Sequence, residues 1–190
     1  VDVVVLSYAK SRREYDLTSR CIEALRAASP SVALRVVVVE TNDRLADAAF
    51  VADEAQLFGP AVTVVSPGGP FSYNTFLRAG ITACDDLPAR AVLVLNNDVE
   101  AFSEGFVEDL VAALGEVDSV SPLGVREALW WRPPGDAAVV VDDRVSHGLV
   151  GWCLLIARRV LDQVGAHVCF PDDGVWYEQD TRYAEVLRAH

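Results

Sequence analysis

The hydrophobic positions of this chain alternate between short continuous runs and longer segments with helical spacing. The apolar runs have the length and composition of buried strands and cover residues 3–7, 35–40, 61–66 and 91–95, with a further short strand expected at 119–121. Segments with apolar residues three and four positions apart separate them, at residues 15–28, 45–57, 71–84 and 102–114. This alternation of strand and helix predicts a largely parallel sheet with helices on both faces.

The pattern becomes less regular after Pro122. We expect a loop at 130–135, an edge strand at 137–141, an apolar segment at 148–156, a short helix at 158–164, a loop at 170–174 and a last helix that runs to His190. Neither an internal repeat nor a long linker divides the sequence. We therefore expect one domain over residues 1–190, with a regular half at 1–100 and an irregular half at 101–190.

Composition narrows the class of protein. The chain has 190 residues, of which 52% are hydrophobic and 23% charged, an ordinary globular balance. A net charge of -12 argues against a broad nucleic-acid-binding face. The sequence holds four cysteines without a C-x-x-C pair, and no apolar run approaches the roughly 20 residues of a membrane span. Buried free thiols in a reducing compartment are expected, which favours a cytoplasmic protein.

The strand at 91–95 ends abruptly in three polar residues, Asn96-Asn97-Asp98. Open α/β sheets bind ligands at the carboxyl ends of their strands. Asp98 carries a hard oxygen ligand suited to Mg²⁺ or Mn²⁺, and such ions often arrive with a phosphate-bearing substrate. The alternative is that Asn97 or Asp98 simply starts a turn.

Two other strand ends carry candidate nucleotide contacts. Ser7 and Tyr8 close the first strand without a glycine-rich phosphate loop, and Lys10 next to them is either a cation near a diphosphate or a solvated charge. Glu40 closes the second strand, where an acid can accept hydrogen bonds from a ribose. Asn42 or Asp43 is expected to cap the following helix instead.

In the last helix, spacing separates two carboxylates. One face carries Trp176, Asp180, Tyr183 and Leu187. Asp180 therefore interrupts an inward stripe, and an inward carboxylate must be paired, hydrogen-bonded or functional. Glu178 lies on another face, four residues before Arg182, a spacing typical of a surface ion pair. The alternative for Asp180 is a helix N-cap.

Taken together, these residues resemble the inverting GT-A glycosyltransferases of family 2, the rhamnosyltransferase-like group. The resemblance covers nearly the whole chain, and its order and spacing carry it. Its parts are Ser7-Tyr8, Glu40, Phe71-Ser72-Tyr73-Asn74 with Gly80, Leu95-Asn96-Asn97-Asp98-Val99, Gly151-Trp152-Cys153-Leu154-Leu155-Ile156 and Gln179-Asp180. The resemblance implies a Rossmann-like three-layer α/β fold of the GT-A type with a mostly parallel central sheet. Residues 1–100 would then bind the nucleotide-sugar, and residues 101–190 would hold the acceptor and the catalytic base.

The resemblance also implies roles for particular residues. Asp98 would bind Mn²⁺ or Mg²⁺, with His190 as a second metal ligand or as an exposed terminal residue, and Asp180 would be the general base. The donor would contact Ser7, Tyr8, Lys10, Glu40, Asn74 and Asn97. The acceptor would contact Trp130, Trp152, Trp176 and Glu178, although tryptophans also serve as ordinary packing. The chain departs from the family at three positions: Asn96 replaces an aspartate, Gln179 replaces a glutamate, and Glu40 stands where an aspartate is usual.

The implied reaction is metal-dependent transfer of a sugar from a nucleoside diphosphate sugar to a hydroxyl. The acceptor stays open among a glycan, a lipid carrier, a small molecule and a modified nucleic-acid base. A sugar-phosphate nucleotidyltransferase and a non-catalytic nucleotide-sugar-binding module are the alternatives. The chain is short for this family, so it is expected to be either a minimal enzyme or a fragment.

Overall fold

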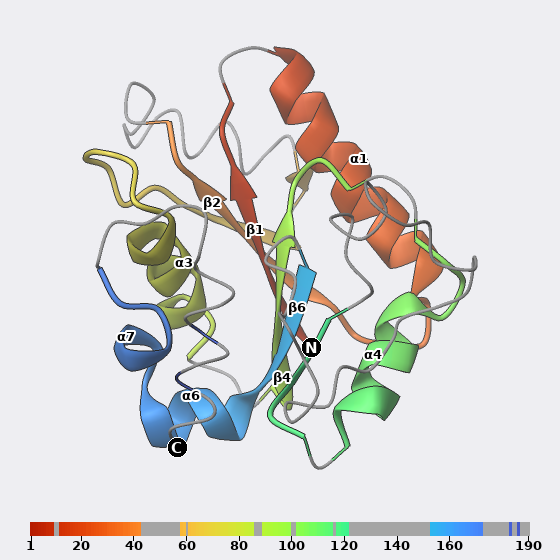
Figure 1. Cartoon of the computed structure of the whole chain (residues 1–190). Helices are drawn as coiled ribbons and strands as arrows, with labels where there is room; N and C mark the ends of the chain where they lie inside the picture. Colours follow the sequence, from red (N-terminus) through yellow and green to blue (C-terminus); the bar gives the residue numbers. More distant parts are fainter. Residues whose placement is uncertain are drawn as a thin grey trace, which may run out of the picture.

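The computed structural model describes residues 1–9, 12–42, 58–59, 61–85, 89–99, 102–115, 117–121, 153–172, 183 and 186. A six-stranded sheet in the order β3-β2-β1-β4-β6-β5 forms its centre (Figure 1). The strands are β1 (Asp2–Ser7), β2 (Arg35–Glu40), β3 (Val62–Val65), β4 (Ala91–Asn96), β5 (Ser119–Val120) and β6 (Cys153–Ala157). The expected edge strand at 137–141 and the expected helix at 45–57 lie outside the described residues.

The sheet is mostly parallel, which confirms the prediction from the strand–helix alternation. β1 pairs in parallel with β2 and with β4, and β2 pairs in parallel with β3. β6 runs antiparallel to both β4 and β5. The sequence indicated only an apolar segment at 148–156, which the structure shows to end in β6. A local pattern does not encode the direction in which a strand joins its neighbours.

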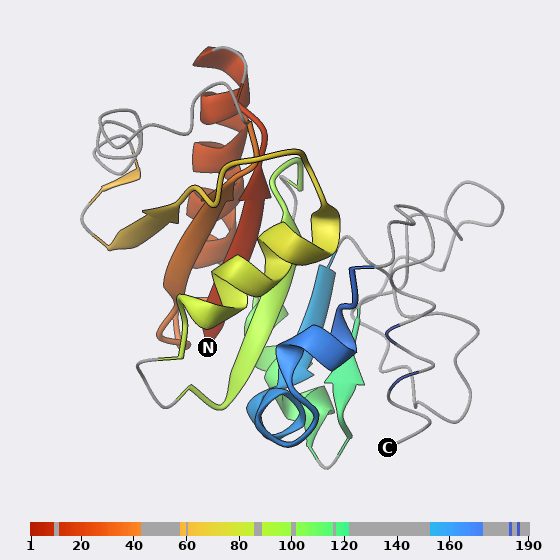
Figure 2. The same ribbon diagram turned by 90° about the vertical axis from the view of Figure 1, so that its left-hand side faces the viewer.

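Helices cover both faces of the sheet. The described helices are α1 (Arg12–Ala28), α3 (Tyr73–Thr82), α4 (Phe106–Leu114), α6 (Arg158–Val164) and α7 (Ala166–Cys169). Figure 1 shows α1 and α4 on one face and α3, α6 and α7 on the other, and Figure 2 looks directly onto the second face. None of the helices within the described ranges has the length and hydropathy needed to cross a membrane.

Two helices begin later than the hydrophobic spacing predicts. α3 begins at Tyr73, after the extended residue Ser72, and α4 begins at Phe106. The start of α4 is set by Gly105, whose φ of 78° is left-handed and therefore suits glycine. Phe102 precedes the helix but packs on Phe106, with 5.0 Å between the ring centroids. The hydrophobic spacing therefore begins before the helix does.

α3 packs closely on β1 and β2. Val4 and Val39 are fully buried on these strands, and Gly80 of α3 lies directly over them. A Cβ added at Gly80 would overlap Val4 Cγ1 and would lie 2.7 Å from Val39 Cγ2. The absence of a side chain at Gly80 therefore allows the helix backbone to approach the sheet closely.

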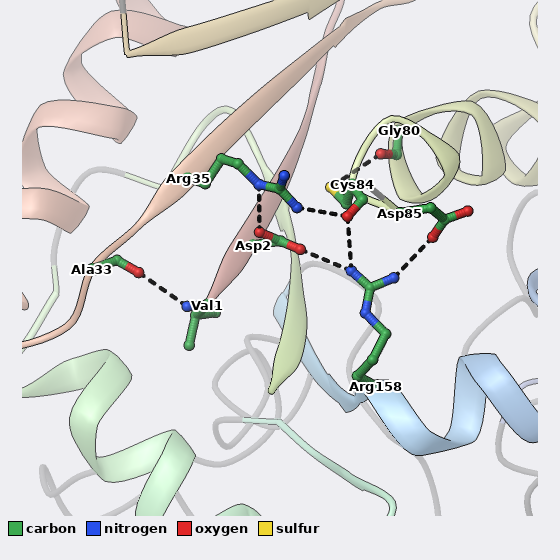
Figure 3. A network of polar contacts seen from close by, with 8 residues as sticks. All are labelled: Val1, Asp2, Ala33, Arg35, Gly80, Cys84, Asp85 and Arg158. Atoms are coloured by element: carbon green, nitrogen blue, oxygen red, sulfur yellow. Dashed lines mark hydrogen bonds and ion pairs between the residues drawn. The ribbon is translucent and has the colours of Figure 1, made fainter. Parts of the chain in front are cut away.

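A network of charged groups closes the amino end of the parallel strands (Figure 3). The buried Asp2 carboxylate accepts hydrogen bonds from Arg35 Nε at 2.7 Å and from Arg158 Nη2 at 2.8 Å. Both guanidinium groups also donate to the Cys84 carbonyl, and Arg158 pairs with Asp85 at 2.9 Å. The network joins β1 and β2 to the end of α3 and to the start of α6.

All four cysteines are buried and free, as the sequence predicts. Burial raises the pKa of Cys84 and of Cys169 to about 11, and it raises that of Cys153 still further. These thiols are consequently protonated and poorly nucleophilic near neutral pH.

Candidate functional site

The polar residues predicted at the ends of β1, β2 and β4 lie side by side at one edge of the sheet. In the strand register, Ser7 pairs with Glu40 of β2, and Leu6 pairs with Asn96 of β4. The chain passes outward from β1 through β2 to β3 and then returns to place β4 on the other side of β1. Such a reversal of strand order is where open α/β sheets bind their ligands.

Glu40 points into the protein rather than toward solvent. Its side chain is fully buried, and its Oε1 accepts hydrogen bonds from the main-chain N–H of Asn42 at 2.7 Å and of Ala9 at 3.2 Å. The Asn42 side-chain amide donates in turn to the Ala9 carbonyl at 2.6 Å. Asn42, expected as a possible helix cap, thus connects two strand ends, while Asp43 lies outside the described residues.

A second chain of hydrogen bonds joins β4 to β1 through α1. Asn97 Nδ2 donates to Thr18 Oγ1 at 2.9 Å, and the Thr18 hydroxyl lies 3.3 Å from Ser7 Oγ. Thr18 and Ser7 are both fully buried. Sequence reasoning missed Thr18, although a signal was available: a polar residue on the inward face of α1, three and seven positions before Cys21 and Leu25.

Asp98 is an exposed carboxylate at this edge. It lies with Asn97 in the turn that follows β4, so the expected turn and the exposed carboxylate occur together. The Asn96 carbonyl faces inward, 3.5 Å from Cys21 Sγ. Within the part of the chain that the structure describes, no three His, Cys, Asp or Glu side chains gather into a possible metal site.

Tyr8 is an exposed aromatic residue at the end of β1. Its side chain is 47% exposed, whereas Ser7 before it and Ala9 after it are fully buried. The buried neighbours anchor the main chain on either side, so the ring stands on a fixed backbone. An exposed ring in this position is able to stack on a planar ligand group.

The beginning of α3 holds the segment that follows α7. Asn74 Nδ2 donates to the Pro171 carbonyl at 2.5 Å, and Arg78 Nη2 pairs with the Asp172 carboxylate at 2.5 Å. Thr75 Oγ1 donates to the same carboxylate at 2.6 Å. The hydrogen bond from Arg78 is the main cause that lowers the pKa of Asp172. In the structure, Asn74 positions this segment, and its predicted contact with the donor stays a prediction. Figure 2 shows α3 and α7 side by side here.

The predicted last helix is represented by Tyr183 and Val186, both helical. Tyr183 is fully buried, as its place on the inward stripe predicts, and its ring stacks on Phe170 at 5.1 Å between centroids. Burial raises the pKa of its hydroxyl above the usual range. The predicted site residues that lie outside the described ranges are Lys10, Trp130, Trp152, Trp176, Glu178, Asp180 and His190.

Comparison with known proteins gives matches at the level of structure. No family model and no curated protein matches the sequence. A mannosyltransferase from Pyrobaculum calidifontis, solved in complex with GDP-Man and Mn²⁺, matches with a TM-score of 0.62 and 17% identity over 90% of this chain and 49% of its own. The bifunctional IspDF from Campylobacter jejuni matches with a TM-score of 0.58 and 12% identity over 97% of this chain and 46% of its own.

The galactosyltransferase LgtC, solved with donor and acceptor sugar analogues, matches with a TM-score of 0.50 and 15% identity over 98% of this chain and 70% of its own. The chain thus spans about half the length of the mannosyltransferase and of IspDF. At these identities the comparison establishes the fold. The six-stranded, mostly parallel sheet with helices on both faces is a GT-A-type fold, as found in nucleotide-sugar transferases.

Proposed function

We propose that this chain transfers a sugar from a nucleoside diphosphate sugar to an acceptor hydroxyl, with inversion at the anomeric carbon. The observation that carries the proposal is the meeting of β1, β2 and β4 at the point where strand order reverses in a GT-A-type sheet. Exposed Asp98 and half-exposed Tyr8 lie at that edge. Function comes from the site rather than from the fold, so the remaining argument concerns these residues.

The donor-binding edge suits a divalent ion that is held partly by the protein and partly by the diphosphate of the donor. Asp98 offers a solvent-exposed carboxylate, a ligand type that Mg²⁺ and Mn²⁺ prefer, and the Asn97 amide is directed toward Thr18. One carboxylate suffices when diphosphate oxygens and water complete the coordination. When bound, the ion would neutralise charge on the departing diphosphate. From the sequence, Lys10 is a candidate cation beside the diphosphate, and His190 is a candidate metal ligand.

On the acceptor side, we assign the general base to Asp180. The acceptor oxygen forms a bond to the anomeric carbon while the bond from that carbon to the diphosphate oxygen breaks. The acceptor proton passes to the Asp180 carboxylate, and the nucleoside diphosphate leaves with the bonding electrons. Burial of Tyr183, three residues further along the chain and on the same predicted helix face, supports the predicted inward position. Trp130, Trp152, Trp176 and Glu178 are the proposed acceptor contacts.

The test is a thermal-shift panel of UDP-, GDP- and dTDP-sugars with and without Mn²⁺. A donor at 100 times its Kd stabilises the folded state by about 2.7 kcal/mol, which raises the Tm of a chain of this size by about 5–10 °C. We expect Asp98→Asn to remove the Mn²⁺-dependent part of the shift. Asp162→Asn is the matched control, because Asp162 is exposed on α6 at the opposite edge. A panel without any shift would contradict the proposal.

Product analysis separates transfer from the alternatives. We expect Asp180→Asn to keep the donor-induced Tm shift and to lose release of nucleoside diphosphate. Donor binding without any release or hydrolysis by the unaltered chain would favour a binding module. Pyrophosphate released from a nucleoside triphosphate and a sugar phosphate would favour a nucleotidyltransferase.

A further inference from the structure

We infer that Glu40 is a positioning residue that holds the main chain after β1 in the shape needed for donor binding, and that it does not contact the nucleotide itself. The importance of this shape for the donor rests on the proposed function. The hydrogen bonds from Ala9 N and Asn42 N to the Glu40 carboxylate, which we call the clamp, rest on geometry alone. The inference differs from the role that the position of Glu40 at a strand end predicts, which is a hydrogen bond to a ribose.

The first argument is the burial of the carboxylate. Glu40 is fully buried, so its oxygens have no surface at which a ribose hydroxyl could approach. A buried carboxylate is tolerated when hydrogen-bond donors surround it. The donors include two main-chain N–H groups: Ala9 N lies 3.2 Å from Oε1 and 3.4 Å from Oε2, and Asn42 N lies 2.7 Å from Oε1. Hydrogen bonds to charged groups are among the stronger ones in proteins.

The second argument is that the clamp extends the sheet beyond its last ladder pair. The register of β1 and β2 ends at Ser7 and Glu40. Past that point, Thr41 donates to the Ser7 carbonyl from both its N–H and its hydroxyl, each at 2.8 Å. At Ala9, Glu40 accepts from the N–H and the Asn42 amide donates to the carbonyl at 2.6 Å. Both main-chain polar groups of Ala9 are thereby held.

The clamp determines how Tyr8 is presented. Tyr8 lies between anchored Ser7 and anchored Ala9, and its ring is 47% exposed at the edge where the donor is proposed to bind. Loss of the Ala9 anchor would free the backbone on one side of Tyr8. Glu40 would then affect donor affinity through Tyr8, and the effect would be the same for every nucleobase.

Two substitutions separate positioning from direct contact. Glu40→Gln keeps an Oε1 that can accept from both N–H groups, so we expect amide hydrogen exchange at Ala9 and Asn42 to stay within about threefold of the unaltered chain. Glu40→Asp withdraws the carboxylate by one carbon–carbon bond, about 1.5 Å. We expect it to accelerate exchange at Ala9 at least tenfold. Glu23→Asp is the matched control, because it makes the same change at an exposed position of α1 and leaves the Ala9 contacts in place.

Donor affinity is then measured on the same variants with the UDP-, GDP- and dTDP-sugar panel. We expect Glu40→Gln to keep affinity for every donor within about threefold. We expect Glu40→Asp to weaken all donors by a similar factor. A Glu40→Gln variant with protected Ala9 that loses one nucleotide selectively would overturn the inference, as would unchanged exchange in Glu40→Asp. If the unaltered chain binds no donor, the proposed function fails while the exchange measurements still decide the clamp.

Discussion

Gly80→Ala is a sharp test of how α3 is packed on the sheet. An added methyl group would overlap Val4 Cγ1 and would lie 2.7 Å from Val39 Cγ2, whereas carbon atoms in contact prefer about 3.5–4.0 Å. Both valines are fully buried, and β-branched side chains have few alternative χ1 angles. The helix must therefore move away from β1 and β2 by about 1 Å or the strands must yield.

The magnitude follows from two opposing terms. Overpacking a well-filled core costs about 1–3 kcal/mol, and two simultaneous overlaps place Gly80→Ala at the upper end. Alanine in place of glycine within a helix returns about 1 kcal/mol. We expect a net loss of about 2 kcal/mol in the free energy of unfolding, which lowers the Tm by about 4–8 °C for a chain of this size.

Urea unfolding followed by circular dichroism measures this loss. Thr82→Ala is the control, since Thr82 is exposed on the same helix and a surface substitution changes stability by no more than about 0.5 kcal/mol. Val4→Ala removes the overlapping methyl group, so the double variant with Gly80→Ala should be at least about 1 kcal/mol more stable than the sum of the single losses. Additive losses, or a Gly80→Ala variant as stable as the unaltered chain, would refute the packing argument.

Three further predictions concern polar contacts. Thr18→Val removes the acceptor of the Asn97 amide and should lower the free energy of unfolding by about 1–2 kcal/mol, measured in urea. No measurable change would show that this part-buried hydrogen bond does not stabilise the fold. The pKa of Asp172 is lowered in the folded state by Arg78, so its stabilisation is present above the unfolded pKa of about 3.9 and is lost as pH falls through the folded value. Arg78→Met should return that pKa upward in an NMR titration, and an unchanged titration would contradict the pairing. Asp2→Asn leaves two guanidinium groups without their shared carboxylate and should cost about 3 kcal/mol, read from the urea midpoint against the unaltered chain.

The strands of this protein were predictable because burial on both faces requires continuous apolar runs. The run at 35–40 coincides with β2, and the run at 91–95 with all but the last residue of β4. The antiparallel direction of β6 was not predictable, since strand direction is set by tertiary pairing and a local hydrophobic pattern does not record it. Helix starts were less predictable for a local reason. At Gly105 the left-handed backbone sets the start of α4, although the hydrophobic spacing continues toward the amino end as far as Phe102.

The candidate site was likewise predictable in part. The sequence placed Ser7, Glu40 and Asp98 at strand ends, and parallel pairing brings such ends to one edge. It did not indicate which of them face inward. Thr18 shows why: its partners Ser7 and Asn97 come from β1 and from the turn after β4, and only the assembled sheet puts them within reach.

By itself, the sequence determined the four parallel strands β1 to β4 and the polar residues at their ends, because the pattern of hydrophobic positions is a local property. The tertiary structure decided what those end residues do. Glu40 is taken into the interior by the N–H of Ala9, 31 positions away, while Asp98 stays exposed in its turn. Whether a carboxylate is buried and hydrogen-bonded or free to bind a ligand depends on the donors that distant segments bring to it. Hydrophobic periodicity does not encode those donors.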